Sequence, residues 1–162
     1  MVKKAVTVIA LVGLLAGCAH APYTVEAPFN PESVSWSQTP GTDTLKGQAF
    51  LRTVDGHVKT CAGYPVILVP YNRYFAEVTR AYVRGYSALT NKDPRAHGYA
   101  RETRCDADGK FSFSNLPSGE WLVVAEVRWG IPDGDFVLPQ GGVVYATETT
   151  SRASSEEVIL TR

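Results

Sequence analysis

The sequence predicts an all-β sandwich that carries one short helix. Short runs of alternating apolar and polar residues, separated by frequent turn residues, are typical of sandwiches and barrels. The chain has 162 residues, enough for one ordinary hydrophobic core and hardly for two. We therefore expect one folded domain, spanning residues 45–162.

The first strands are recognised by their turns and by their apolar patterns. Residues 48–53 alternate, and Asp55-Gly56 offers the positive φ angles of a tight hairpin before a short arm at 58–61. Residues 66–69, Val-Ile-Leu-Val, form a continuous apolar run that is typical of a strand buried on both faces.

Residues 71–93 interrupt this rhythm. Phe75, Val78 and Tyr82 recur at intervals of three and four, so we expect one short helix inside a longer excursion. Tyr and Arg are enriched at recognition surfaces, and the candidate binding residues of the excursion are Tyr71, Arg73, Tyr74, Tyr82, Arg84 and Tyr86. The alternative, which we favour, is that the helix covers an open end of the sandwich and its tyrosine rings are buried.

Strand patterns return after the excursion. The remaining predicted strands are 99–105, 110–114, 121–129, 143–149 and 156–161. In 121–129 the alternate residues Trp121, Val123, Ala125, Val127 and Trp129 share one face. Residues 130–142 are rich in Gly, Pro and Asp, which predicts a loop between two strands.

The stretch Asp106-Ala107-Asp108-Gly109 is the part of the chain that most resembles a metal-binding loop. A calcium loop of the EF-hand type needs glycine at its sixth position and glutamate at its twelfth. Counting from Asp106, those positions hold Phe111 and Pro117, so the pattern fails. Asp side chains bond nearby amides, so we expect a turn between two strands and no metal site.

The N-terminus has the features of an export signal, with two lysines before a short apolar run. The run ends in Leu15, Ala16, Gly17 and Cys18. This motif resembles the lipobox of bacterial lipoprotein precursors, in which the signal is cut before the cysteine and acyl chains such as palmitate are attached. The resemblance implies a signal peptide at 1–17 and a membrane anchor at Cys18. An ordinary secretory signal with a chance cysteine is the alternative.

Residues 18–44 precede the first predicted strand. Four prolines lie among Ser, Thr and Asn, without a sustained period, which predicts a flexible lipid-anchored tether. In polyproline form it would reach roughly 80 Å at about 3.1 Å per residue. Phe29, Val34 and Trp36 are the residues that suggest partial docking on the domain.

The two other cysteines are a candidate disulfide pair. If Cys18 carries lipid, Cys61 and Cys105 are left to pair in an oxidising compartment. Their bond would stabilise the fold by roughly 4 kcal/mol on the chain-entropy account. Two separately buried thiols are the alternative, because pairing depends on a distance that the sequence does not give.

One stretch carries a resemblance to a known domain family. Gly47 to Thr53, the turn before residues 66–69, and above all TRCDADGKFSFSNLPSGEWLVVAEV are similar to the carboxypeptidase regulatory-like domain. That family is a transthyretin-like sandwich of seven strands, in which an Asp-rich turn opens a strand with alternating aromatics. A Leu-Pro-x-Gly turn, here residues 116–119, then leads into a long central strand. The resemblance covers about residues 45–162 and implies a non-catalytic domain.

Catalytic motifs are missing from the sequence. It contains no His-Glu-x-x-His, Cys-x-x-Cys or Gly-x-Ser-x-Gly, so we expect neither an enzyme nor a cofactor. Removing residues 1–17 takes away two lysines and leaves 14 basic against 16 acidic residues, which gives no footprint for nucleic acid.

We therefore expect a lipid-anchored protein of the bacterial cell envelope, facing the periplasm or exterior, with a structural or protein-binding role. Ala19 after the cysteine favours the outer membrane under the family's sorting rule. Two alternatives are an accessory domain that binds envelope polysaccharide or peptide, and a secretion-system outer-membrane lipoprotein.

Overall fold

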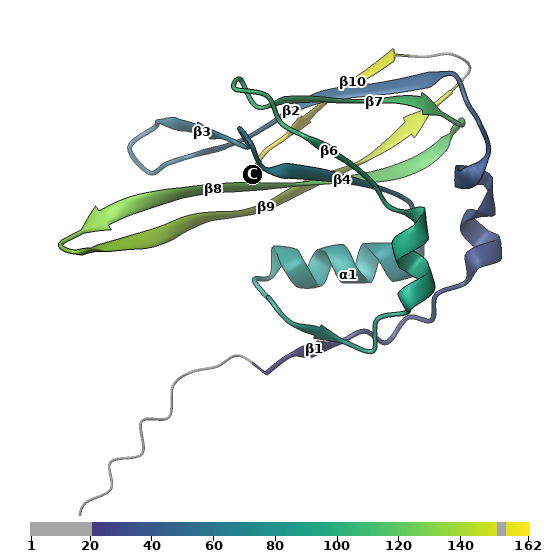
Figure 1. Ribbon diagram of the computed structural model, residues 1–162, viewed down its shortest axis with the longest axis horizontal. Helices are drawn as coiled ribbons and strands as arrows, with labels where there is room; N and C mark the ends of the chain where they lie inside the picture. Colours follow the sequence, from purple (N-terminus) through teal and green to yellow (C-terminus); the bar gives the residue numbers. More distant parts are fainter. Residues whose placement is uncertain (1–20, 152–154) are drawn as a thin grey trace, which may run out of the picture.

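The computed structural model describes residues 21–151 and 155–162. The predicted signal peptide and Cys18 lie outside these residues. Two four-stranded β-sheets pack face to face, and a helix and the N-terminal segment cover the outer face of one of them (Figure 1). The predicted class, an all-β sandwich with a short helix, is confirmed.

The first sheet is built around β2. β2 pairs in parallel with β10, antiparallel with β7, and at its far end with the short strand β3. The bounds are β2 Asp43–Arg52, β3 Val58–Thr60, β7 Lys110–Leu116 and β10 Ser155–Leu160. Gly47 in β2 leaves room for its neighbours, because a Cβ there would lie 2.5 Å from the Phe111 ring.

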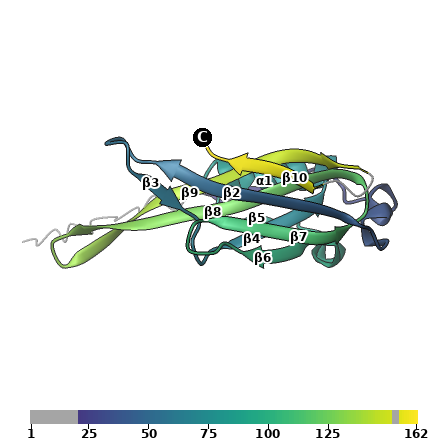
Figure 2. The ribbon, with the colours of Figure 1, turned by 90° about the horizontal axis from the view of Figure 1, so that it is seen from above.

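The second sheet is antiparallel, in the order β6-β4-β8-β9. The bounds are β4 Pro65–Pro70, β6 Arg101–Arg104, β8 Gly119–Asp133 and β9 Phe136–Thr150. β8 and β9 form a hairpin that extends well beyond the other strands (Figure 2).

Two features of these sheets differ from the sequence-based expectations. The sandwich has eight strands, whereas the transthyretin-like resemblance implies seven; the short β3 arm is included in the eight. Residues 130–142 are mostly strand rather than loop, because β8 and β9 stay paired as far as Asp133 and Phe136. Beyond the sandwich each of these strands has a free edge, where proline loses no ladder hydrogen bond.

The core between the sheets is formed by the predicted inward face of β8. Trp121, Val123, Ala125 and Val127 are at most 1% exposed. Cys61 and Cys105 lie in the same core and form a disulfide, with Cα atoms 5.7 Å apart, as predicted. Because the two cysteines follow β3 and β6, the bond joins the two sheets.

A second core lies on the opposite face of the second sheet. Val69 and Leu122 pack there against α1 (Arg73–Val83) and the 3₁₀ helix η2 (Pro94–Tyr99). Residues 66–69 are thus buried from both sides, as their apolar run predicted. No helix in the described part of the chain is long and apolar enough to cross a membrane.

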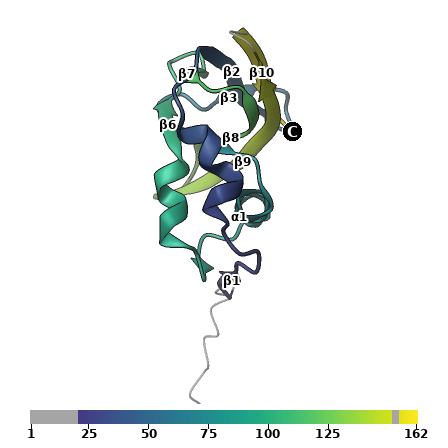
Figure 3. The ribbon, with the colours of Figure 1, turned by 90° about the vertical axis from the view of Figure 1, so that its right-hand side faces the viewer.

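The N-terminal segment Tyr23–Gln38, here called the strap, closes the second core (Figure 3). It contains β1 (Tyr23–Thr24), which pairs in parallel with β5 (Leu89–Thr90), and the 3₁₀ helix η1 (Pro31–Gln38). Its buried apolar side chains are Val25, Ala27, Phe29 and Val34, and Trp36 packs edge-on against Trp121 at 5.0 Å.

The strap corrects the prediction of a flexible tether at 18–44. Residues 23–38 are part of the folded domain, because apolar side chains at positions 25, 27 and 29 reach the second core. Proline restricts φ and suits extended and turn conformations, so it is compatible with a packed extended segment as well as with a loose one. The docking that these residues suggested is present in the structure: Phe29 and Val34 pack in the second core, and Trp36 packs against the core between the sheets.

Candidate functional site

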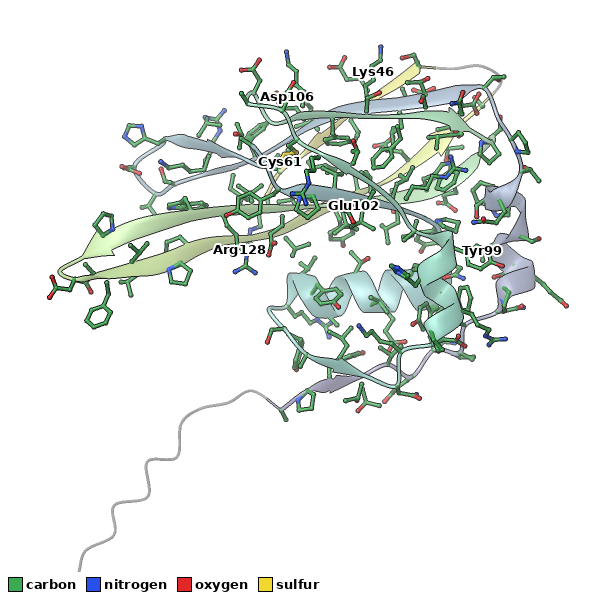
Figure 4. The ribbon with its side chains drawn as sticks, in the orientation of Figure 1. Lys46, Cys61, Tyr99, Glu102, Asp106 and Arg128 are labelled. Carbon is green, nitrogen blue, oxygen red and sulfur yellow. A yellow bond between two sulfur atoms is a disulfide. The ribbon has the colours of Figure 1, made fainter. Side chains whose placement is uncertain are left out.

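A large hollow with a polar lining lies where the end of α1 approaches the projecting part of the β8–β9 hairpin. Its volume is about 590 Å³. We call it the arginine cleft, after the lining residues that define it: Tyr82, Arg84, Tyr86, Glu126, Arg128 and Arg162. Arg128 points from the hairpin toward the side of the sheet on which α1 lies (Figure 4).

One wall of the cleft is the C-terminal turn of α1. The helix begins with Asn72, whose side chain accepts a hydrogen bond from the Phe75 N–H at 2.9 Å. It ends at Val83, and the chain reverses two residues later at Gly85, which has a φ of +90°. The Tyr86 N–H then donates to the Ala81 carbonyl at 3.2 Å. This turn brings the predicted binding residues Tyr82, Arg84 and Tyr86 to the same cleft.

The opposite wall is the outer face of β8. Leu122 and Val124 on this face lie in or against the second core, and Glu126 and Arg128 continue the same alternation into the cleft. The two charged side chains form an ion pair. This pair keeps the Arg128 guanidinium beside the hollow and orients it through its Nε atom.

Two glycines of β9 allow close approaches in the cleft, Gly141 to the backbone of β8 and Gly142 to the third arginine, Arg162. Gly141 has a φ of +115°, and a Cβ there would lie 1.9 Å from the Val127 carbonyl oxygen. A Cβ on Gly142 would lie 2.7 Å from the guanidinium of Arg162. Arg162 follows β10 and donates a long hydrogen bond of 3.4 Å to the Gly141 carbonyl. Residues from three distant parts of the chain therefore meet in the cleft.

The structure separates the six predicted binding residues into two groups. Tyr82, Arg84 and Tyr86 line the cleft, whereas Tyr71 borders a small hollow at the other end of α1 and Arg73 is exposed on the first turn. Tyr74 is 4% exposed, and its hydroxyl accepts a hydrogen bond from the Asp93 N–H at 3.0 Å. For Tyr74 the packing interpretation holds, although α1 covers a sheet face rather than an open end.

Sequence reasoning did not identify Glu126, Arg128 or Arg162. A signal existed for the first two, because the alternation that places Trp121 to Val127 inside also places residues 126 and 128 on the opposite face. No sequence pattern indicated that Arg162 would lie in the cleft. Its position depends on the pairing of β10 with β2, which lies more than 100 residues away in the chain.

The strap supports the wall of the cleft. The Tyr23 ring lies 5.2 Å from the Tyr86 ring, and the Tyr23 N–H donates to the Ala88 carbonyl at 3.0 Å. Glu77 of α1 holds the strap through three accepted hydrogen bonds, from the Tyr23 hydroxyl and from the backbone N–H groups of Glu26 and Ala27 at 2.7–2.9 Å. The hydrogen bond from the Glu26 N–H is the main cause that lowers the pKa of Glu77.

Glu77→Gln should therefore lower the free energy of unfolding by about 1–2 kcal/mol at pH 7. Because the folded-state pKa of Glu77 lies below its ordinary value of 4.5, the carboxylate stabilises the fold fully above that value. The contribution is lost as the pH falls through the lowered pKa. The difference between the two proteins should thus shrink on acidification, which urea unfolding at pH 7 and pH 3 measures.

Glu102→Gln is the matched control for this measurement. Glu102 is an exposed glutamate of β6, so its replacement should leave the unfolding free energy nearly unchanged at either pH. A Glu77→Gln effect that is the same at pH 3 and pH 7 would contradict the role assigned to the carboxylate.

The Asp106–Gly109 segment is a turn, as expected. The Asp106 carboxylate accepts hydrogen bonds from the N–H groups of Asp108 and Lys110 at 2.9 and 2.8 Å, and Gly109 has a φ of +77°. Within residues 21–151 and 155–162 no three His, Cys, Asp or Glu side chains are grouped as metal ligands.

Comparisons with known proteins bear on the fold and on the kind of protein. No protein-family model matches the sequence, and no curated protein matches it. A solved structure from Pseudomonas aeruginosa, described as a candidate carbohydrate-binding protein, is 25% identical with a TM-score of 0.68. The similarity covers 85% of this chain and 100% of the other.

A minor pilin of Streptococcus agalactiae is a more distant structural neighbour. It is 15% identical with a TM-score of 0.39, and the similarity covers 75% of this chain and 44% of the pilin. At that distance it has no bearing on function. Neither neighbour is described as an enzyme.

Proposed function

We propose that this protein is a non-catalytic, lipid-anchored protein of the bacterial cell envelope that binds carbohydrate in the arginine cleft. The observation that carries the proposal is the composition of the cleft, in which two tyrosines and three arginines line one hollow. Tyrosine offers an apolar ring face and a polar hydroxyl, and guanidinium offers several directed donors. A sugar ring presents the matching apolar faces and hydroxyl oxygens.

The similarity to the Pseudomonas aeruginosa protein supports this proposal. It extends over the whole of that chain, and its description suggests carbohydrate binding. A volume of about 590 Å³ is within the usual range for small-ligand sites. The open rim of the cleft would admit part of a longer polymer as well as a free oligosaccharide.

The lipid anchor is the second part of the proposal, and it determines where binding takes place. Because the strap begins at Tyr23, only five residue steps separate it from the proposed anchor at Cys18. Such a segment spans at most roughly 18 Å. The domain would then lie close to the membrane surface, most simply that of the outer membrane, rather than at the end of a long tether.

Carbohydrate binding is tested with the mature protein in detergent and a panel of immobilised envelope polysaccharides. Tyr82→Ala should weaken retention on the bound polysaccharide by about tenfold, because the ring loses its contact with the sugar. Tyr82 is only half-buried where it lines the cleft, so its truncation should leave the domain folded, which thermal unfolding checks.

Tyr71→Ala is the matched control. Tyr71 is 42% exposed at the other end of α1 and should bind polysaccharide like the wild type. Equal binding by wild type and Tyr82→Ala would remove the cleft as the site. Failure of every polysaccharide to bind would overturn the proposed function.

A further inference from the structure

The charge of the arginine cleft is unbalanced. Its charged lining side chains are three arginines and one glutamate, a formal excess of two positive side-chain charges. The whole chain has a formal net charge of zero, so this excess is local. Positive charge gathered in a hollow attracts anions more strongly than the same charge spread over a surface.

In the part of the chain that the structure describes, two of the three guanidinium groups have no carboxylate side chain as partner. Within the described residues, neither Arg84 nor Arg162 forms an ion pair. Arg128 is paired with Glu126 through its Nε atom. The cleft therefore presents two guanidinium groups that pair with no carboxylate side chain of the described residues.

The end of α1 does not cancel this excess. A helix C-terminus carries a partial negative charge from its free carbonyl groups. Here the carbonyls of Arg80, Ala81 and Tyr82 accept hydrogen bonds from the N–H groups of the following turn. Arg84 lies at this end of the helix and offsets what partial charge is left.

We infer that the ligand of the arginine cleft is an acidic saccharide, with carboxylate or other anionic groups on its sugar rings. This inference rests on the proposed function and goes beyond it by assigning the class of carbohydrate. Guanidinium binds carboxylate through two parallel hydrogen bonds, which recognise geometry as well as charge. The tyrosines would contact the ring while Arg84 and Arg162 bind its anionic groups.

The test compares acidic oligosaccharides with the same molecules after their charge has been removed. Oligogalacturonate and its methyl ester are one such pair, and sulfated and desulfated oligosaccharides are another. The mature protein should bind at least one acid about tenfold more tightly than its neutral counterpart at low salt. Added salt should reduce this preference.

Arg84→Gln should reduce the preference severalfold, because it should weaken binding of the acid more than binding of the neutral counterpart, while Arg128 and Arg162 remain in the cleft. Arg73→Gln is the matched control, because it removes an exposed arginine of α1 outside the cleft. Equal binding of acid and neutral forms would overturn the inference and leave carbohydrate binding standing. Binding of neutral polysaccharides alone would do the same, and failure of all saccharides would overturn both proposals.

Discussion

Replacing Phe29 with alanine should lower the free energy of unfolding by about 3–4 kcal/mol. Phe29 is 6% exposed, and its ring packs against those of Tyr74, Phe75 and Tyr99 at centroid distances of 5.2–5.6 Å. Truncation would remove these contacts and leave a cavity that the rigid sheet below cannot fill. Urea unfolding of the wild type and the variant measures the difference.

Phe136→Ala is the control for the Phe29 measurement. Phe136 lies at the tip of the β8–β9 hairpin and is 76% exposed, so the same chemical change should cost little stability. Similar small losses for both variants would mean that the strap does not pack in solution. The original expectation of a loose tether at 18–44 would then be restored.

The sandwich could be predicted because its signals are local. Alternation in 121–129 identified the buried face of β8, and the apolar run at 66–69 identified a strand with cores on both sides. The projecting hairpin was missed for a physical reason. Gly and Pro disrupt a strand that is paired on both edges, but residues 130–142 have partners on one edge only.

The strap shows how composition can mislead. Its prolines and small polar residues are typical of linkers, although Tyr23, Val25, Ala27 and Phe29 alternate before η1 begins. This alternation is a signal for a half-buried extended segment, and the proline content drew attention away from it. The burial of these side chains depends on the second core, which is built by α1 and η2 from a distant part of the chain.

The candidate site was predictable only in part. Tyrosine and arginine in the excursion drew attention to residues 82–86 because these residue types are enriched at recognition surfaces, and the structure places Tyr82, Arg84 and Tyr86 around one hollow. Residue type could not show that Tyr74 faces the core while Tyr82 lines a cleft. Nor could it bring Arg162 beside Arg128, since that arrangement depends on strand pairing between distant segments.

Replacing Cys18 with serine should abolish labelling by a palmitate analogue and leave the precursor uncleaved, because the proposed lipid is attached to the thiol of Cys18. Several acyl chains at about 0.8 kcal/mol per buried methylene hold a protein on a membrane effectively permanently. Metabolic labelling followed by membrane fractionation measures labelling, cleavage and membrane association in one experiment. The bilayer anchor is thus expected to depend on a single sulfur atom.

Ala19→Ser is the matched control, since it changes the neighbouring residue and keeps the thiol. It should be cleaved and labelled like the wild type. Continued labelling of Cys18→Ser would remove the anchor hypothesis, and the arginine cleft would then be free to act away from the membrane. If Cys18→Ser is not labelled, the lipid on Cys18 anchors the wild-type protein. The wild-type domain would then lie within roughly 18 Å of the bilayer, because the strap fixes the chain from Tyr23 onward. The acidic saccharides available to the cleft would then be those that lie at the membrane surface.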